Sequence, residues 1–221
     1  MTSVEKVRVK VVPLGSSGVG KTSLAMKYTA DVFSNMYIST VGQETQFKEI
    51  MVDDKVVKME IHDTAGQERF RAVTRSLYRD VDCCVLVFDV TNRNSFESLD
   101  FWMNEFLLTR CPEVPADFPF VVLGNKCEME QRLVTKKEAI RWCQEKYCNI
   151  NYFDVSAKED INLELAFQTV AKKALKLKSE EIKIQPTDVS QRVKLKDEGL
   201  NQSKQSWWSW WSWWKSRFSW C

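Results

Sequence analysis

The sequence predicts an α/β fold: a six-stranded, mostly parallel sheet with one antiparallel edge strand and helices on both faces. Apolar runs with strand periodicity alternate along the chain with segments of helical periodicity, and such alternation requires right-handed crossovers between parallel strands. Two of the runs follow each other directly and are joined at Asp53-Asp54, which is typical of a hairpin. The length of 221 residues is enough for one such domain and an additional segment.

Each expected element rests on a local pattern. The first strand, residues 7–12, is apolar at alternate or adjacent positions and leads through a glycine-rich turn into a helical pattern at 21–28. Pro13 has no N–H to donate to a sheet, so we expect it at the very end of this strand or else a cost in stability. The same patterns predict the other strands at 46–52, 55–61, 83–90, 120–123 and 151–155, and the other helices at 95–109, 135–147 and 163–177.

The composition narrows the classes of partner and compartment. A formal net charge of +2 gives no global sign of nucleic-acid binding or of a strongly acidic substrate. The seven cysteines form no CxxC pair and no zinc-finger spacing, and their odd number argues against a closed disulfide framework. We therefore expect a reducing, cytosol-facing environment and no disulfides. No secretory signal peptide is visible, and no apolar run is long enough to span a bilayer.

The composition changes sharply along the chain and predicts three regions: a globular domain at 1–178, a flexible hypervariable linker at 179–206 and a tryptophan-rich tail at 207–221. The linker is rich in Lys, Glu, Gln and Ser and has little apolar periodicity. The tail combines six closely spaced indoles with Lys215 and Arg217, which is the composition of a segment at a membrane interface. The alternative is a low-complexity extension without a role.

The turn after the first strand matches the phosphate-loop pattern GxxxxGK[ST] in the required place, between a strand and a helix. Its backbone N–H groups can converge on phosphate oxygens, and the amino terminus of the helix adds partial positive charge. Lys21 would reach the β and γ phosphates, and Thr22 would offer its hydroxyl to Mg²⁺. The motif makes this a P-loop nucleoside-triphosphatase fold, with candidate nucleotide-binding residues Gly15, Ser16, Ser17, Gly18, Val19, Gly20, Lys21, Thr22 and Ser23.

A second group of motifs defines a resemblance. Asp63 follows the second hairpin strand, where a carboxylate can hold a metal through water. The motifs GSSGVGKTS, DTAGQERF, GNKC and SAK, in this order, resemble those of the Ras-superfamily GTPases. DTAGQERF, CCVLVFDVT and FPFVVLGNK are most similar to the Rab branch, and within it to the late-endosomal Rab seven type. The resemblance covers about residues 7–177 and identifies 1–178 as a small GTPase domain.

The resemblance implies a molecular switch in vesicle traffic to late endosomes and lysosomes, which binds GTP or GDP with Mg²⁺ and hydrolyses GTP slowly. Thr40 would join Thr22 and Asp63 at the metal while the γ-phosphate is present. Gly66 would sense that phosphate through its backbone N–H, and Gln67 would be the catalytic residue that orients the attacking water.

The resemblance also implies a base-binding site. Phe33 would stack on the guanine edge, unless it is a core residue at a helix end, and Tyr37 would close over the nucleotide. Two further loops would contact the edge, face and carbonyl of the base. Their candidate residues are Asn125, Lys126, Glu128, Ser156, Ala157 and Lys158.

Glu128 departs from the family pattern, which has an aspartate at this position. An aspartate would accept the ring N–H and the exocyclic amine of guanine together, a pair that adenine cannot reproduce. The additional methylene of glutamate displaces the carboxylate by about 1.5 Å unless the side chain folds back or the loop shifts. We therefore expect guanine selectivity to be retained but weakened.

Two further departures concern partners. Rab proteins usually place aromatic residues across the switch surface, but Thr45 stands at the expected Phe and His62, the sole histidine, at the expected Trp. We expect effectors of ordinary late-endosomal Rabs to bind this protein poorly. A proton-sensing role of His62 is one interpretation, and a half-exposed strand residue with a polar tip is the other.

The resemblance implies an exchange factor, a GTPase-activating protein and GTP-dependent effectors as partners, and no nucleic acid. Cys221 is the candidate lipidation site; if it is prenylated, a GDP-dissociation inhibitor or escort protein is a further partner. One lipid chain gives only marginal membrane affinity, so the tail would supply the second signal for the cytoplasmic face of endosomal or lysosomal membranes, with a cytosolic pool. The alternative function is a nucleotide-binding trafficking adaptor with impaired GTP cycling. An ATP-dependent P-loop kinase would have no use for the GNK and SAK loops.

Overall fold

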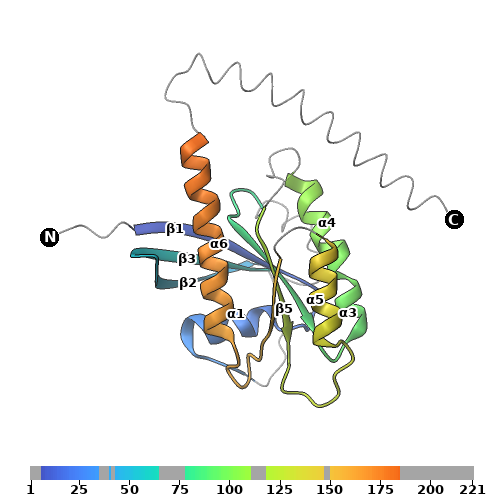
Figure 1. The fold of residues 1–221 in the computed structure, drawn as a ribbon. Coiled ribbons are helices and arrows are strands. Elements are labelled where there is room, and N and C mark those ends of the chain that lie inside the picture. Colours follow the sequence, from blue (N-terminus) through green and yellow to red (C-terminus); the bar gives the residue numbers. More distant parts are fainter. Residues whose placement is uncertain are drawn as a thin grey trace, which may run out of the picture. The chain divides into compact units, whose positions relative to one another are not determined.

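The computed structural model describes residues 6–34, 40, 43–64, 78–110, 118–146 and 150–184. A six-stranded sheet in the order β2-β3-β1-β4-β5-β6 forms its centre (Figure 1). The strands are β1 (Lys6–Leu14), β2 (Gln43–Val52), β3 (Lys55–Thr64), β4 (Cys83–Asp89), β5 (Phe120–Asn125) and β6 (Asn151–Asp154). The helices are α1 (Lys21–Ala30), α3 (Arg93–Glu97), α4 (Leu99–Arg110), α5 (Lys136–Glu145) and α6 (Leu163–Ile184).

The predicted mixed sheet is confirmed. Only β2 and β3 pair in antiparallel fashion among the described strands, and β2 lies at the edge of the sheet. The hairpin turn falls at Asp53 and Asp54, as expected, with Val52 opposite Lys55. Both aspartates have positive φ, 46° and 62°, which a two-residue turn of the primed type requires.

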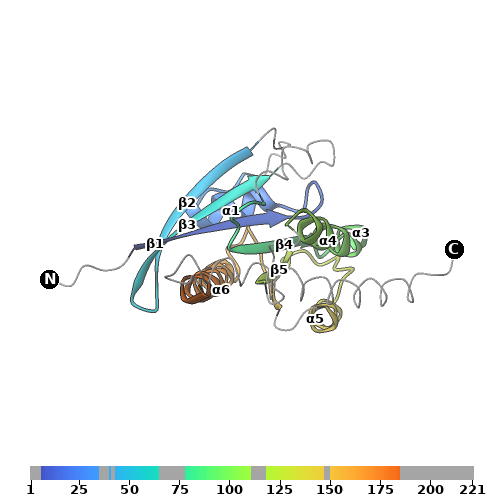
Figure 2. The same cartoon turned by 90° about the horizontal axis from the view of Figure 1, so that it is seen from above.

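The core has two layers, one on each face of the sheet. Along the central strand β4 all residues are buried, and successive side chains point to opposite faces. Val85 and Val87 join the cluster under α1 and α6, whereas Leu86 and Phe88 join the cluster under α3, α4 and α5. In Figure 2, α3, α4 and α5 lie on the right, and α6 lies apart from them on the left. Helices on both faces are thereby confirmed.

Pro13 lies one residue before the end of β1, not at its very end. The backbone N–H and carbonyl of Lys10 both bond Asp82, on the β4 side, at 2.6 and 2.8 Å. Backbone groups alternate in direction along a strand, so the Pro13 nitrogen faces β3. The pairing of β1 with β3 ends at Val11 and Ile61, so the missing N–H of Pro13 lies beyond that ladder.

The expected helix at 95–109 is interrupted. α3 ends at Glu97, and α4 begins at Leu99. Between them the Ser98 hydroxyl donates to the carbonyl of Ser95 at 2.8 Å, and such a bond back to the preceding turn bends helices. The sequence periodicity continued across this residue and gave no sign of the break.

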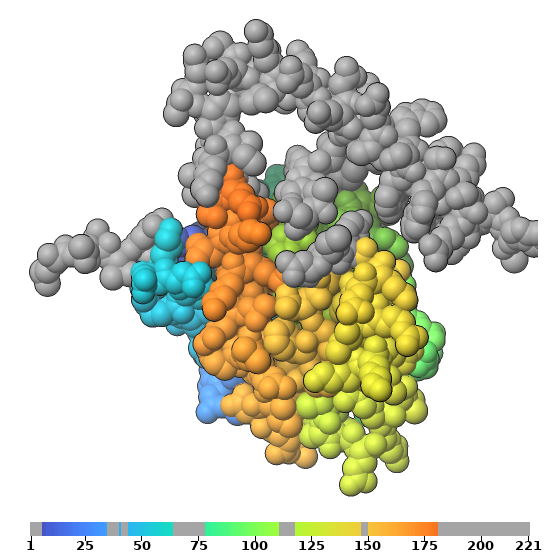
Figure 3. All heavy atoms as spheres, in the orientation of Figure 1, coloured from blue at the N-terminus to red at the C-terminus, as the bar shows by residue number. Residues whose placement is uncertain are grey.

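α6 is longer than the predicted 163–177 and continues to Ile184. The chain divides after Lys178 into two units, and residues 179–184, the described part of the second, are the last residues of this helix. The outer side of α6, orange in Figure 3, is exposed on the face shown. Among the described residues, no helix combines the length and the apolar character needed to cross a bilayer.

Candidate nucleotide-binding site

The phosphate loop lies between β1 and α1, as predicted, and two glycines let it approach the ends of other strands. A Cβ on Gly15, whose φ is +152°, would lie 2.1 Å from the carbonyl oxygen of Val87 in β4. A Cβ on Gly20, at φ +97°, would lie 2.2 Å from Nδ2 of Asn125 in β5. A side chain at either position would therefore push the loop away from the carboxyl ends of β4 and β5, where α/β folds bind ligands.

Lys21 is the first residue of α1, and its side chain lies under the loop. It is buried, and its Nζ donates to the carbonyls of Gly15 at 2.8 Å and Ser16 at 3.0 Å. Burial lowers the pKa of Lys21 to about 8, and the nearby carboxylate of Asp63 opposes that shift. A buried ammonium is stabilised by an anion, so this lysine is suited to contact phosphate oxygens.

The three predicted metal ligands meet, although they come from three separate segments. The Thr22 hydroxyl donates to Oδ2 of Asp63 at 2.5 Å and lies 2.7 Å from the hydroxyl of Thr40. Asp63 is only 1% exposed, at the carboxyl end of β3. One carboxylate and two hydroxyls fit Mg²⁺, which usually keeps several waters and substrate phosphates as ligands. Within the described residues, no cluster of three His, Cys, Asp or Glu side chains provides an alternative metal site.

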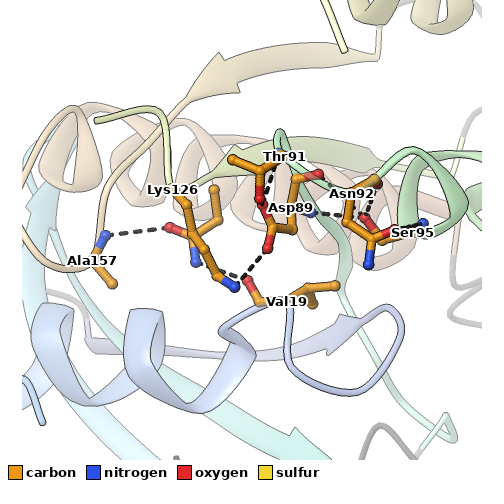
Figure 4. A network of polar contacts seen from close by, with 8 residues as sticks. Val19, Asp89, Thr91, Asn92, Ser95, Lys126 and Ala157 are labelled. Atoms are coloured by element: carbon orange, nitrogen blue, oxygen red, sulfur yellow. Dashed lines mark hydrogen bonds and ion pairs between the residues drawn. The ribbon is translucent and has the colours of Figure 1, made fainter. Parts of the chain in front are cut away.

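Asn125 joins the phosphate loop to both predicted base loops through its contacts with Val19 and Ala157, which Figure 4 labels. Its Nδ2 donates to the carbonyl of Val19 at 2.8 Å, and its Oδ1 accepts from the backbone N–H of Ala157 at 3.3 Å. The adjacent Lys126 has a positive φ of 64°, and its Nζ lies 2.5 Å from Oδ2 of Asp89. Asn125 is buried, so these contacts hold three loops in one arrangement.

The loop at Ser156, Ala157 and Lys158 follows β6. Ser156 is fully buried, and its hydroxyl accepts from the N–H of Glu159 at 2.9 Å. Ala157 is also buried, whereas Lys158 is exposed and forms an ion pair with Glu159 at 3.4 Å. The first two residues therefore form the buried part of the loop, with the backbone N–H of Ala157 already bonded to Asn125.

Glu128 lies in the turn after β5 and is half-buried. Its Oε2 is buried and has no hydrogen-bond partner among the described residues. A buried carboxylate oxygen without a donor is costly, and a ligand that brings a donor would remove that cost. This property fits a residue that faces a base.

The other predicted residues lie against the core, beside the phosphate loop or outside the described residues. Phe33 is half-buried and packs against the core cluster under α1 and α6, which was the alternative interpretation of this residue. Ser17 is exposed and Ser23 is half-buried beside the loop. The switch, catalytic and lipidation candidates Tyr37, Gly66, Gln67 and Cys221 lie outside the described residues.

Thr45 and His62 face each other across β2 and β3. The Thr45 hydroxyl lies 3.2 Å from Nδ1 of His62. Burial lowers the pKa of His62, Lys10 lowers it further, and Glu60 opposes the shift. The histidine is thus a half-buried strand residue with a polar contact, which matches the simpler of its two interpretations.

Two residues of this region were missed by the sequence analysis. Asp89 ends a strand of buried apolar residues, and that position alone could have drawn attention to it. Ser98 gave no such signal, yet its hydroxyl lies 2.8 Å from that of Ser16 in the phosphate loop. The four cysteines in the described part of the chain, Cys83, Cys84, Cys127 and Cys143, are free thiols.

A strand, a phosphate loop, a buried lysine at the start of the next helix and a carboxylate at the end of β3 define a P-loop nucleotide-binding protein. The chain matches the Ras family over residues 10–176. It is 52% identical to Ras-related protein Rab-7a of Dictyostelium discoideum over 190 residues, 86% of this chain and 93% of that protein. It is 51% identical to Ras-related protein Rab7 of Drosophila melanogaster over 180 residues, 81% of this chain and 86% of the relative.

A third relative, the Ypt/Rab-type GTPase avaA of Emericella nidulans, is 51% identical over 177 residues, 79% of this chain and 86% of that protein. The chain belongs to the Ras family and, within it, to the Rab7-type small GTPases. It binds GTP and GDP with Mg²⁺, hydrolyses GTP, and acts in trafficking together with exchange factors, GTPase-activating proteins and effectors.

Proposed function

We propose that the protein is a GTP-dependent switch on the cytoplasmic face of late endosomal or lysosomal membranes, with a cytosolic pool. The observation that carries the proposal is the convergence of Thr22, Thr40 and Asp63. Thr40 lies between α1 and β2, so a ligand contact of Thr40 that requires the γ-phosphate would be made with GTP bound and lost after hydrolysis. The endosomal compartment is inferred from the Rab7 relatives.

In this proposal the site residues that the structure describes have separate roles. Lys21 neutralises the β and γ phosphates, and its two carbonyl contacts keep the ammonium under the loop. Mg²⁺ would be held by Thr22, Thr40 and, through water, Asp63, and would neutralise charge on the phosphates. Asn125 and Ala157 position the base loops against the phosphate loop.

Hydrolysis is assigned to Gln67, which would orient the attacking water, with Gly66 sensing the γ-phosphate through its N–H. Without an arginine from an activating protein, the rate should be on the order of 10⁻⁴ to 10⁻³ per second. The test is to identify the nucleotide that copurifies and to follow single-turnover GTP hydrolysis in the wild type and in Gln67→Leu. The switch is supported if guanine nucleotide copurifies and if the wild type hydrolyses GTP slowly whereas Gln67→Leu does not hydrolyse it. Tight GTP binding without any turnover supports the adaptor, and absence of purine nucleotide contradicts both.

The Thr45–His62 pair supports a difference in effector choice. A hydroxyl and an imidazole in contact present less apolar surface than the aromatic side chains usual at these positions. We expect the GTP-loaded protein to recover late-endosomal Rab effectors weakly in a pull-down. A Thr45→Phe, His62→Trp double variant should recover them better, and equal recovery by both proteins would contradict this assignment.

Membrane attachment is proposed to use Cys221, prenylated and handled by an escort protein or a GDP-dissociation inhibitor. The indoles and cations at 207–217 would add the second membrane signal that one lipid chain needs. Mass spectrometry of protein from a prenylating host tests the modification. An unmodified cysteine would leave the tail as the only membrane signal.

A further inference from the structure

Asp89 is a buried carboxylate at the end of β4, 7% exposed, in register with Asn125 of β5. Its Oδ1 accepts from the backbone N–H and the hydroxyl of Thr91, at 2.8 and 2.7 Å. Its Oδ2 lies 2.5 Å from Nζ of Lys126 (Figure 4). The two oxygens therefore have different tasks: one closes the turn after β4, and the other holds a side chain of the predicted base loop.

The backbone around Asp89 is fixed by further hydrogen bonds. The Asp89 N–H donates to the hydroxyl of Ser95 at 3.0 Å. That serine is held in turn by the side chain of Asn92, the residue that caps α3. A charge on such a rigid support acts as an anchor with a defined position, because neither the strand end nor the turn can move without breaking several bonds.

Lys126 is fixed at both ends. Its backbone has a left-handed conformation that few residues other than glycine adopt, and it follows Asn125, which is bonded to two other loops. Its ammonium is paired with Asp89. A free lysine side chain loses considerable conformational entropy when it is ordered, and the ion pair restricts the side chain in advance.

We propose that Asp89 is a positioning residue for nucleotide binding: its carboxylate anchors the Lys126 ammonium so that the lysine stem covers the face of the base. The inference rests on the proposed contact of Lys126 with the base. It predicts that Asp89 slows nucleotide release without touching the nucleotide. A purely structural Asp89 would instead only close the turn at Thr91.

The test compares two substitutions that remove one contact each. Asp89→Asn keeps the shape and the acceptor for Thr91 but removes the charge that holds Lys126. The matched control Thr91→Val removes a hydroxyl bonded to the same carboxylate and leaves the ion pair intact. Release of a fluorescent GDP analogue is followed in the presence of Mg²⁺ after mixing with excess GDP, and thermal unfolding is recorded for each protein.

Loss of one charge-assisted hydrogen bond predicts release about tenfold faster in Asp89→Asn, and a change within about twofold in Thr91→Val. Lys126→Met keeps a stem over the base but loses the anchored ammonium, so it should match Asp89→Asn, and the double variant should release no faster than either single variant. If Asp89→Asn does not fold, the release rate of Lys126→Met is compared with that of the wild type, and the threefold limit given below applies to it.

A rise of less than about threefold in Asp89→Asn, or in Lys126→Met where that variant stands alone, overturns the inference. So does a double variant whose effects multiply, because the two residues would then act separately. If wild-type protein binds no guanine nucleotide, the proposed function fails first, and that outcome is visible before any variant is compared.

Discussion

We propose that Glu128 is the residue that limits nucleotide selectivity. Its buried Oε2 lacks a donor within the described structure, and its carboxylate is carried one methylene further than an aspartate would carry it. We predict that Glu128→Asp raises GDP affinity about ten- to a hundredfold, because a well-aligned charge-assisted hydrogen bond contributes about 1.5–3 kcal/mol.

The measurement is the affinity for GDP and for ADP in both proteins, and selectivity for GDP should rise in Glu128→Asp. The matched control is Glu130→Asp, the same chemical change at an exposed residue two positions along the chain. Equal GDP-over-ADP selectivity in Glu128→Asp and wild type would show that this side chain does not limit recognition.

We predict that Lys21 makes nucleotide affinity depend on pH. Burial lowers its pKa to about 8, and a bound phosphate would raise that pKa again. Above pH 8 the complex therefore holds more protons than the free protein, so GDP affinity should fall, by roughly tenfold between pH 7.5 and 9.5. Stability of nucleotide-free protein should change in the opposite sense, rising between pH 8 and 10.5, because there the unfolded chain binds more protons.

Calorimetry across this pH range measures the affinity and the proton uptake together. Lys21→Arg serves as the control, since a guanidinium stays charged throughout and should give a flatter profile at lower affinity. A wild-type profile as flat as that of the arginine variant would rule out titration of Lys21.

At the scale of elements, local patterns could be read from the sequence but the junctions between elements could not. The hairpin and the phosphate loop are each encoded within a few neighbouring residues, so both were predicted. At the helix break Ser98 makes a hydroxyl bond back to Ser95, a contact that no periodicity reveals. The Asp89–Lys126 pair depends on the register of β4 against β5, and residues 37 positions apart meet only after that register is set.

The approach of α1 to β5 is set by Gly20, and its substitution tests that contact. In Gly20→Ala the new methyl group would lie 2.2 Å from Nδ2 of Asn125, at a φ that alanine rarely adopts. We predict a loss of about 1–3 kcal/mol in the free energy of unfolding and faster GDP release. The loss of unfolding free energy caused by Gly20→Ala should be smaller in an Asn125→Ala background, where the clashing atom is absent. An unchanged loss in that background would show that backbone strain alone causes it.

At the scale of the whole molecule, the sequence predicted the fold because apolar runs, turns and the phosphate-loop motif all agree. The roles of the candidate site residues stay predictions. Thr22, Thr40 and Asp63 converge as expected, whereas Phe33 packs with the core. The packing of Phe33 against this cluster depends on the tertiary fold, which local sequence patterns do not reveal.

The end of the globular part is fixed by contacts of α6 with the sheet. Lys178 pairs with the buried Asp82 at 3.1 Å and donates to the backbone carbonyl of Arg8. These contacts tie the helix to β1 one residue before the predicted linker begins. Residues beyond 184 should therefore be dispensable for nucleotide binding, and the tail can be tested apart from the GTPase.

Removal of residues 207–221 should abolish flotation of the unmodified protein with anionic liposomes and leave GDP affinity unchanged. Indoles prefer the headgroup region, and each cation near an anionic surface contributes about 1 kcal/mol. Replacing Lys215 and Arg217 by glutamine should therefore weaken binding to anionic vesicles by roughly tenfold or more and leave binding to neutral vesicles unchanged. If the truncated and full-length proteins float equally, the tail has no membrane role, and attachment depends on a lipid at Cys221 alone.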